Sequence, residues 1–348
     1  MQNKTAIIIS DRMTTSLMRR RWYSRSAQKA LEITHARSEI VIPFYNWLQP
    51  DGSINEVELK KDRATKHLAN MGTFHGLIYI HPLKAHYRFG FDEPAAMPQI
   101  VKSLRSQITI AHRLCNPERP YALLVIHLGL SQEKDLKPFF RNVITAMQQV
   151  ADDADENRVM ISLEPDPIQE YGYTPGTVPQ IYQLIPQLEA IAPRRNLKVP
   201  FSITFDLAHT YLSSKKDYAT VQRIIQEAGD RIYYAHVNAP IYRGTPGREI
   251  PQGKPVPTKR LKRWLFDARN IIFTEDGHGS LDRIPQQQRE EYEKTVRLLA
   301  TATRLPEFGC INLEITPRID RPFEFWRAGS TSRGALYSAE FLDRVMNS

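Results

Sequence analysis

Residues 201–209, FSITFDLAH, decide how the chain is interpreted, because an apolar run that is typical of a buried strand ends there in Asp206, with His209 three residues on. Seven other short runs rich in Ile, Val, Phe and Tyr recur along the 348 residues, starting at Ala6, Glu39, Gly76, Ala122, Val159, Ile232 and Ile311. Nearly continuous apolar runs of this length are typical of strands buried on both faces, as in a parallel sheet.

Amphipathic segments with helical spacing separate several of these runs. Examples begin at Met97, Lys137, Val178 and Tyr218. Eight strands that alternate with helices predict an α/β fold, a single-domain (β/α)8 TIM barrel over residues 1–348, with a doubly wound open sheet as the alternative. Residues 239–270 hold five prolines and are predicted to be an irregular insertion, and residues 317–348 a C-terminal extension.

The chain is basic, with a formal net charge of +9 and a pI of about 9.4. Such a charge favours polyanionic partners, nucleic acid or phosphorylated substrates, through long-range attraction. Within the insertion, a solvated loop and an anion-contacting one are both consistent with the charge. The residues predicted to contact a nucleic-acid backbone are Lys259, Arg260, Lys262 and Arg263.

The cysteine count and the hydropathy favour a cytoplasmic protein. Cys115 and Cys310 lie in no metal or redox motif, so we expect reduced thiols. The N-terminal apolar run is too short for a signal peptide, and no stretch approaches the roughly 20 apolar residues that cross a bilayer. We therefore expect no membrane partner, and no obligate protein partner is evident.

Polar, ligand-type residues collect where the predicted strands end. His81 follows the third strand, His127 the fourth, Glu164 the fifth, Asp206 with His209 the sixth, His236 the seventh and Glu314 the eighth. In a barrel, the chemistry takes place at the C-terminal ends of the strands. A polar centre on the barrel axis would explain why six consecutive predicted strands end in His, Asp or Glu.

Histidine nitrogens and carboxylate oxygens are the ligands that Zn2+, Mn2+ and Fe2+ take in proteins. Seven such groups exceed the three or four protein ligands of one catalytic metal, so the sequence predicts either several ions or some substrate contacts. Asp276 and His278, which flank Gly277, are further metal-ligand candidates, although the glycines around them also predict a plain tight turn. His86 could replace His81 as the third-strand ligand.

This order of strand-end residues resembles the xylose-isomerase-like barrel superfamily, and within it the endonuclease IV family (AP endonuclease family 2). The matching positions are short motifs spread over most of the chain. The resemblance implies metal ligands at His81, His127, Glu164, Asp206, His209, His236, Asp276, His278 and Glu314. It also implies a cofactor of one to three divalent ions, Zn2+ or Mn2+.

Two departures from the endonuclease IV pattern bear on the number of ions. Ala239 stands where that family has an Asp after its His-Leu-Asn turn, and His278 lies inside a Gly-x-Gly turn rather than before one. If the Gly-x-Gly turn of this chain corresponds to the Gly-x-Gly turn of that family, the ligands of a third ion are missing. Sugar isomerases and epimerases of the superfamily share residues that match Glu164, Asp206, His209, His236 and Glu314.

The resemblance therefore leaves two enzymes open. The first is a metal-dependent phosphodiester hydrolase that cuts DNA at abasic sites with metal-activated water. The second is a sugar or sugar-phosphate isomerase or epimerase, in which Glu164 and Glu314 are the catalytic acid/base pair. His81, His127 and the positive charge favour the hydrolase. A nucleic-acid-binding barrel with a degenerate site is the non-catalytic alternative.

Overall fold

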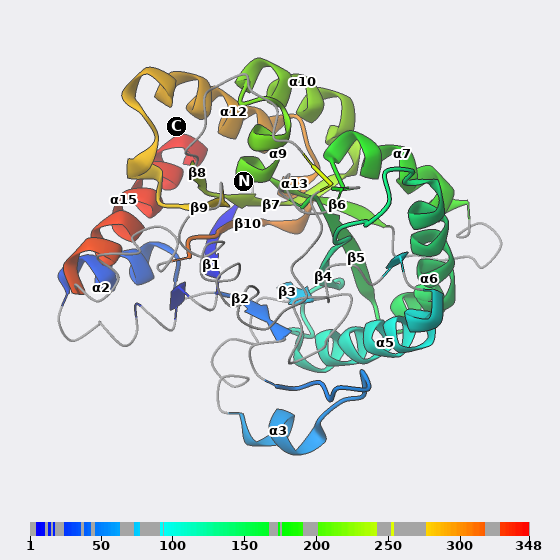
Figure 1. The fold of residues 1–348 in the computed structure, drawn as a ribbon. Coiled ribbons are helices and arrows are strands. Elements are labelled where there is room, and N and C mark those ends of the chain that lie inside the picture. The colour runs from blue at the N-terminus through cyan, green and yellow to red at the C-terminus, as the bar shows by residue number, and fades with distance from the viewer. Residues whose placement is uncertain are drawn as a thin grey trace, which may run out of the picture. The chain divides into compact units, whose positions relative to one another are not determined.

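Eight parallel strands form one closed barrel, in the order β1-β10-β7-β6-β5-β4-β3-β2 (Figure 1). This confirms the predicted (β/α)8 barrel over the open sheet. The computed structural model describes residues 5–10, 13–14, 17, 24–35, 38–42, 46–62, 73–76, 91–92, 94–166, 173–174, 176–190, 201–241, 252–253, 276–316 and 328–347. The barrel strands are β1 Ala6–Ser10, β2 Ser38–Val41, β3 Thr73–Gly76, β4 Ala122–His127, β5 Val159–Glu164, β6 Ser202–Asp206, β7 Ile232–Val237 and β10 Cys310–Leu313.

Seven of these strands begin within one residue of the predicted apolar runs, and the third begins three residues before its run. The structure places β3 at Thr73–Gly76, where the sequence predicted a strand starting at Gly76. Residues 77–81 lie outside the described residues. The sequence analysis placed the start of the strand too late, because it relied on the apolar run LIYI, whereas β3 begins before that run and contains the polar residues Thr73 and His75.

Two compact units share the chain, residues 39–204 and residues 1–38 with 205–348. The first unit contains the helices α3 Glu56–Lys61, η4 Pro94–Ala96, α5 Met97–Leu114, α6 Lys137–Glu156 and α7 Val178–Glu189. Here α5 packs on β4 and α6 on β5, and the two helices pack on each other. Their apolar faces bury the large core residues Leu104, Phe139 and Met147.

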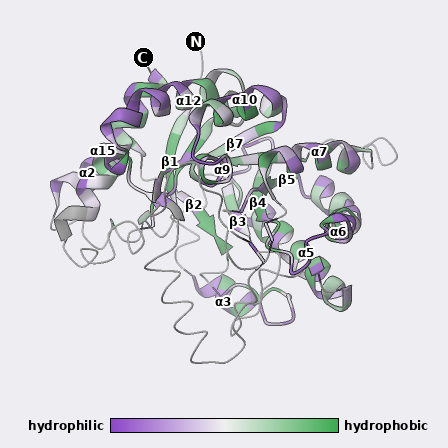
Figure 2. Cartoon of the chain, turned by 45° about the horizontal axis from the view of Figure 1, so that its top comes forward, coloured by the Kyte–Doolittle hydropathy of each residue, from purple (hydrophilic) through white to green (hydrophobic). Residues whose placement is uncertain are grey.

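The second unit contains α2 Arg25–Ile33, α9 Leu207–Ser213, α10 Tyr218–Ala228, η5 Gly229–Arg231, η6 Leu281–Arg283, η7 Gln286–Gln288, α12 Arg289–Thr301, α13 Leu305–Phe308 and α15 Ala328–Asn347. The C-terminal helix α15 packs against α2, α12 and β1. Figure 2 shows hydrophilic and hydrophobic residues side by side on helices such as α10 and α12, as expected for helices with one face on a core.

The start of the predicted insertion pairs with a strand that follows the insertion. β8 Ala239–Ile241 and β9 Asp276–Gly279 form an antiparallel two-stranded sheet. The sequence DGHG therefore belongs to a strand, and the predicted tight turn at these residues is wrong. Glycine is a weak strand former, so local propensity favoured a turn, and pairing with β8 overrides it.

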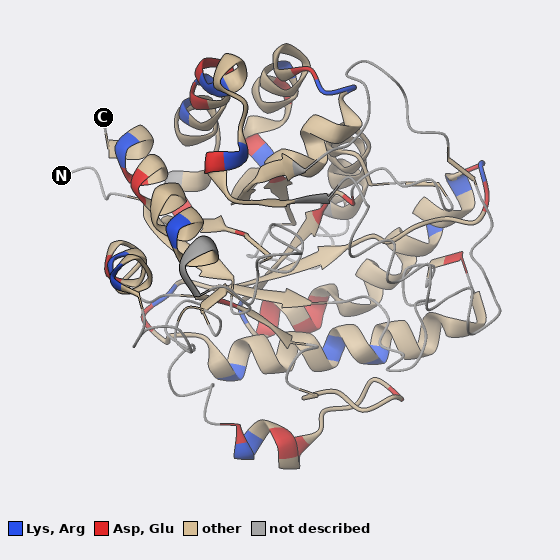
Figure 3. Cartoon of the chain, turned by 60° about the vertical axis from the view of Figure 1, so that its left-hand side comes forward, with Lys and Arg blue, Asp and Glu red and all other residues tan. Residues whose placement is uncertain are grey.

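Local capping signals set several helix starts. Asp217 accepts hydrogen bonds from the backbone of Ala219 and Thr220 at the start of α10, and Thr177 forms a capping box with Gln180 at the start of α7. In α3 the acidic residues lie in the first turn and Lys60 and Lys61 in the last (Figure 3), which complements the helix dipole. None of the helices in the described part of the chain is long and apolar enough to span a membrane.

Candidate metal centre

The predicted ligands that the structure describes lie at or beside the carboxyl ends of barrel strands or on the small sheet. His127 ends β4, Glu164 ends β5, Asp206 ends β6, His236 lies next to the last residue of β7, Glu314 follows β10, and His278 lies on β9. Four of these six side chains are buried, and those of His127 and His278 are partly exposed, at 20% and 16%. Buried charged or ionisable side chains need partners, so the geometry around each one decides its role.

In residues 39–204, two histidines meet one oxygen of a glutamate. The Nε2 atoms of His75 and His127 lie 3.3 and 3.2 Å from the same atom, Oε2 of Glu164. The His75 and His127 rings are 4.9 Å apart between centroids. The other ring nitrogen of each histidine faces another carboxylate, Glu39 or Asp166. We call Glu39, His75, His127, Glu164 and Asp166 the β2–β5 cluster.

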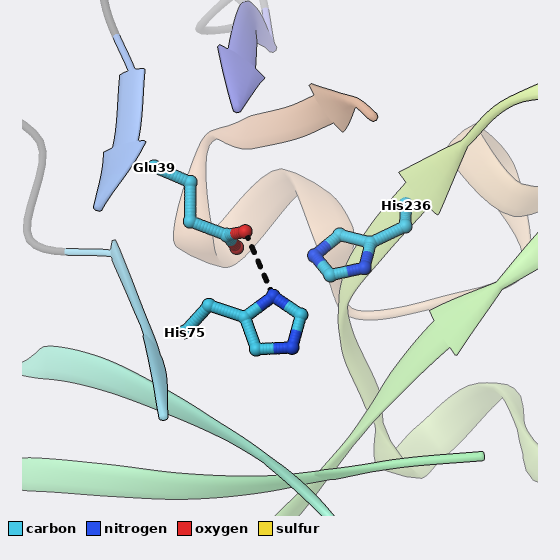
Figure 4. Close-up of side chains that lie close together, drawn as sticks. All are labelled: Glu39, His75 and His236. Atoms are coloured by element: carbon cyan, nitrogen blue, oxygen red, sulfur yellow. Dashed lines mark hydrogen bonds and ion pairs between the residues drawn. The ribbon is translucent and has the colours of Figure 1, made fainter. Parts of the chain in front are cut away.

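Glu39 and His75 were missed by the sequence analysis, which looked for polar residues where apolar runs end. Glu39 lies near the start of β2, and His75 lies inside β3. Figure 4 shows the two side chains facing each other, with their hydrogen bond drawn between His75 and Glu39. The usable signal was a charged or ionisable residue inside an otherwise apolar strand, since such a residue must find partners in the barrel interior.

In residues 205–348, a second glutamate receives two histidines in the same way. Oε2 of Glu314 lies 3.1 Å from Nδ1 of His236 and 3.3 Å from Nε2 of His278. Burial alone would raise the pKa of the Glu314 carboxyl, but His278 and His236 outweigh it and hold that pKa well below its usual range. We call Asp206, His209, His236, His278 and Glu314 the β6–β10 cluster.

Asp206 has a structural role as well as a candidate metal role. Its Oδ1 accepts a 2.7 Å hydrogen bond from the backbone N–H of His209 and so caps the start of α9. An N-cap bonds the residue three positions on, so capping alone explains the Asp-x-x-His spacing. The second oxygen, Oδ2, lies 3.8 Å from His209 Nδ1 and 4.0 Å from His236 Nδ1.

Asn238 holds that second oxygen in place, and the sequence analysis did not identify it. Its side-chain amide donates to Asp206 Oδ2 at 3.0 Å, while its own Oδ1 accepts from the backbone of Ala208. The hydroxyl of Tyr292 donates to the Asn238 carbonyl at 3.0 Å. Burial raises the pKa of Tyr292 well above its usual value, and the charges of Tyr218 and Asp206 add to this.

Both clusters present ligand atoms close enough to share an ion. In one set, His75, His127 and Glu164 each offer an atom, and in the other Asp206, His236 and Glu314 do so, with the atoms of each set within 4.8 Å of one another. Two imidazole nitrogens can approach one carboxylate oxygen either as N–H donors or as lone-pair donors that share a cation with it. The donor types and their burial therefore fit a divalent transition metal.

Several predicted residues cannot be placed. His81, its alternative His86, and the basic residues Lys259, Arg260, Lys262 and Arg263 lie outside the described residues. Asp276 begins β9, but its side chain is not among those described, whereas the ring of His278 lies 5.4 Å from that of His209.

Comparison with known proteins identifies the fold and leaves the family open. No family model matches the chain. None of the curated proteins matches it either. Solved structures do match, at low sequence identity and over nearly the full length. The class that fold and site define is a barrel with clustered histidine and carboxylate side chains at its strand ends.

Three of the matching structures show the extent of the similarity. A D-psicose 3-epimerase from Clostridium cellulolyticum H10 aligns with 13% identity, a TM-score of 0.53 and coverage of 99% of this chain and 96% of that one. A D-allulose 3-epimerase from Methylomonas sp. aligns with 15% identity and a TM-score of 0.52, over 99% of this chain and 98% of that one. A xylose isomerase domain protein from Alicyclobacillus acidocaldarius aligns with 12% identity and a TM-score of 0.51, over 99% of each chain. At these identities the likeness shows the fold alone.

Proposed function

We propose that this chain is a divalent-metal-dependent isomerase or epimerase that acts on a sugar or sugar phosphate. The observation that carries the proposal is the β6–β10 cluster, where Asp206, His236 and Glu314 bring three ligand atoms within 4.8 Å of one another at the ends of barrel strands. The similarity of the whole barrel to two ketohexose 3-epimerases supports the substrate class.

The roles follow from the chemistry of the side chains. Asp206, His236 and Glu314 would hold the ion, which polarises adjacent oxygens of the sugar when bound. Glu164 and Glu314 would exchange a proton at the carbon next to the carbonyl, as a general acid/base pair. His209 would contact the substrate. The basic charge of the chain would favour a sugar phosphate over a neutral sugar.

A metal-dependent phosphodiester hydrolase is the second candidate, and the β2–β5 cluster favours it. His75, His127 and Glu164 form a second set of ligand atoms, which exceeds what one isomerase ion requires. More than one ion is typical of enzymes that activate water for attack on a phosphodiester. DNA with an abasic site is the predicted substrate in that case.

Solvent isotope exchange distinguishes the two candidates. The protein loaded with Mn2+ or Zn2+ is incubated in D2O with a panel of ketoses, aldoses and their phosphates, and deuterium at carbon is followed by NMR. In parallel it is incubated with a duplex that carries one abasic site. The isomerase proposal predicts deuterium incorporation that Glu164→Gln abolishes and the surface variant Glu58→Gln leaves unchanged. Strand cleavage without exchange into any sugar would contradict it.

A further inference from the structure

The β2–β5 cluster contains two carboxylates, Glu39 and Asp166, besides the one that both histidines share. His75 Nδ1 lies 3.3 Å from Glu39 Oε1, and His127 Nδ1 lies 3.3 Å from Asp166 Oδ1. Each ring therefore faces a carboxylate through both nitrogens, because both Nε2 atoms face Glu164. The pattern is two carboxylate–imidazole pairs that converge on one oxygen.

A neutral imidazole cannot satisfy this arrangement alone. One ring nitrogen carries a proton and donates, and the other holds a lone pair. If Nδ1–H donates to Glu39 or Asp166, the lone pair at Nε2 faces a negative oxygen of Glu164, which is favourable when a cation lies at that side. Metal-ligating histidines usually donate their second N–H to a carboxylate or carbonyl, which fixes the tautomer and the ring orientation.

The fold places Glu39 for this role. Val41 pairs with His75 in the β2–β3 register, and side chains two residues apart on a strand point the same way, so Glu39 and His75 share a face. The Glu39 side chain is completely buried, and the His75 side chain is 8% exposed. Burying a carboxylate in a barrel is costly unless its partner needs it.

Asp166 is held for the same role from a different element. It follows β5, and its Oδ2 accepts a 2.7 Å hydrogen bond from the backbone N–H of Gly129. Gly129 has a φ of 83°, a left-handed conformation that favours glycine, in the turn just after His127. This hydrogen bond therefore holds Asp166 beside the end of β4, which carries His127, and leaves Oδ1 facing the His127 ring.

We propose that Glu39 and Asp166 are positioning residues that hold His75 and His127 by Nδ1, so that both Nε2 atoms join Glu164 as ligands of a divalent cation. The inference rests on the metal-binding part of the proposed function and adds the β2–β5 cluster to it as a second metal site. The sequence analysis assigned neither residue.

Two measurements on the full-length protein test the role of Glu39. The first is Co2+ affinity, from competition with a chelating indicator and from the visible absorption bands of the bound ion. The second is the tautomer of His75 in the metal-free protein at pH 8, read from two-bond 1H–15N correlations and assigned with His75→Ala. The variants are Glu39→Gln, the conservative Glu39→Asp, and Glu58→Gln as a surface control.

We expect Glu39→Gln to bind Co2+ about 10- to 100-fold more weakly while it keeps its fold, Glu39→Asp to recover part of the loss, and Glu58→Gln to match the wild type. The wild-type His75 should be the Nδ1–H tautomer, and Glu39→Gln should lose that single state because an amide can accept or donate. An Nε2–H tautomer in the wild type, or unchanged affinity in Glu39→Gln, would overturn the inference. Failure of the wild type itself to bind Co2+ would instead overturn the metal-binding part of the proposed function, together with this inference.

Discussion

The β2–β5 cluster and the β6–β10 cluster have the same central contact and support it differently. In each, nitrogens of two histidines approach one glutamate oxygen, Oε2 of Glu164 or Oε2 of Glu314. In the β2–β5 cluster further carboxylates orient the imidazoles, whereas in the β6–β10 cluster amide groups orient a carboxylate, Asp206.

The difference shows which part of each cluster is fixed before an ion arrives. In the first cluster carboxylates face the imidazole rings, because Nδ1 of His75 is hydrogen-bonded to Glu39 and Nδ1 of His127 lies 3.3 Å from Asp166. In the second, the backbone N–H of His209 and the amide of Asn238 occupy both oxygens of Asp206 and hold its orientation. The predictions below test whether each support does what its geometry implies.

The largest expected effect is at the shared oxygen of the β6–β10 cluster. Glu314→Gln removes the charge between His236 and His278, and breaking a buried ion pair from one side costs about 3 kcal/mol or more. Because the folded pKa of Glu314 is lowered, its stabilisation is complete above the ordinary glutamate pKa and is lost as pH falls through the folded pKa. Unfolding of the metal-free proteins by urea should give a higher free energy of unfolding for the wild type than for the variant at pH 7, and this gap should narrow below about pH 4. A gap that does not depend on pH would contradict the role of the ionised carboxylate.

An intermediate effect is expected at the amide support. Asn238→Ala removes the donor to Asp206 Oδ2 and the acceptor for the Ala208 N–H, at a cost of about 2 kcal/mol. Thermal unfolding measures the loss, and metal titration should show weaker binding. Asn142→Ala is the matched control, since Asn142 makes a hydrogen bond to the Phe91 carbonyl away from both clusters. Equal metal affinity in the two variants would mean that Asn238 does not orient Asp206.

The smallest effect is expected one contact further out. Tyr292→Phe removes the hydrogen bond to the Asn238 carbonyl and should cost about 1 kcal/mol at pH 7. Since the folded pKa of Tyr292 is raised, its stabilisation is present below the ordinary tyrosine pKa of about 10 and is lost as pH rises through the folded value. Denaturant unfolding at pH 7 and pH 11 should therefore show a smaller difference between wild type and variant at the higher pH. A difference that grows with pH would have the wrong sign.

The sequence predicted the barrel, the residues of the β6–β10 cluster and two residues of the β2–β5 cluster, because these depend on short-range patterns. Buried parallel strands are apolar runs, and strand ends carry His127, Glu164, Asp206 and Glu314. Glu39 and His75 were not predicted because they lie within strands and not at strand ends. The role of a polar residue inside a strand becomes clear only when its partner on another strand is known. Asn238 escaped because an amide that orients a carboxylate differs in no local way from any other asparagine.

The spacing of Asp206 and His209 illustrates a different limit. The sequence suggested two ligands one helical turn apart, and the structure shows a helix N-cap with the same spacing. Both roles can hold together, since the cap engages Oδ1 and leaves Oδ2 toward the histidines. Sequence spacing alone does not separate a capping aspartate from a metal ligand.

The central claim, that the strand-end clusters bind metal, is tested most directly by elemental analysis of metal per chain, after purification without chelator and after reconstitution with Zn2+ or Mn2+. We predict at least one equivalent in the wild type, a clear decrease in Glu164→Gln and in Glu314→Gln, and no change in Glu58→Gln. Two or three equivalents would support ions at both clusters and favour the hydrolase candidate. A single equivalent would favour the isomerase and contradict an ion at the second cluster. A wild-type protein that retains no divalent metal after reconstitution would contradict the account.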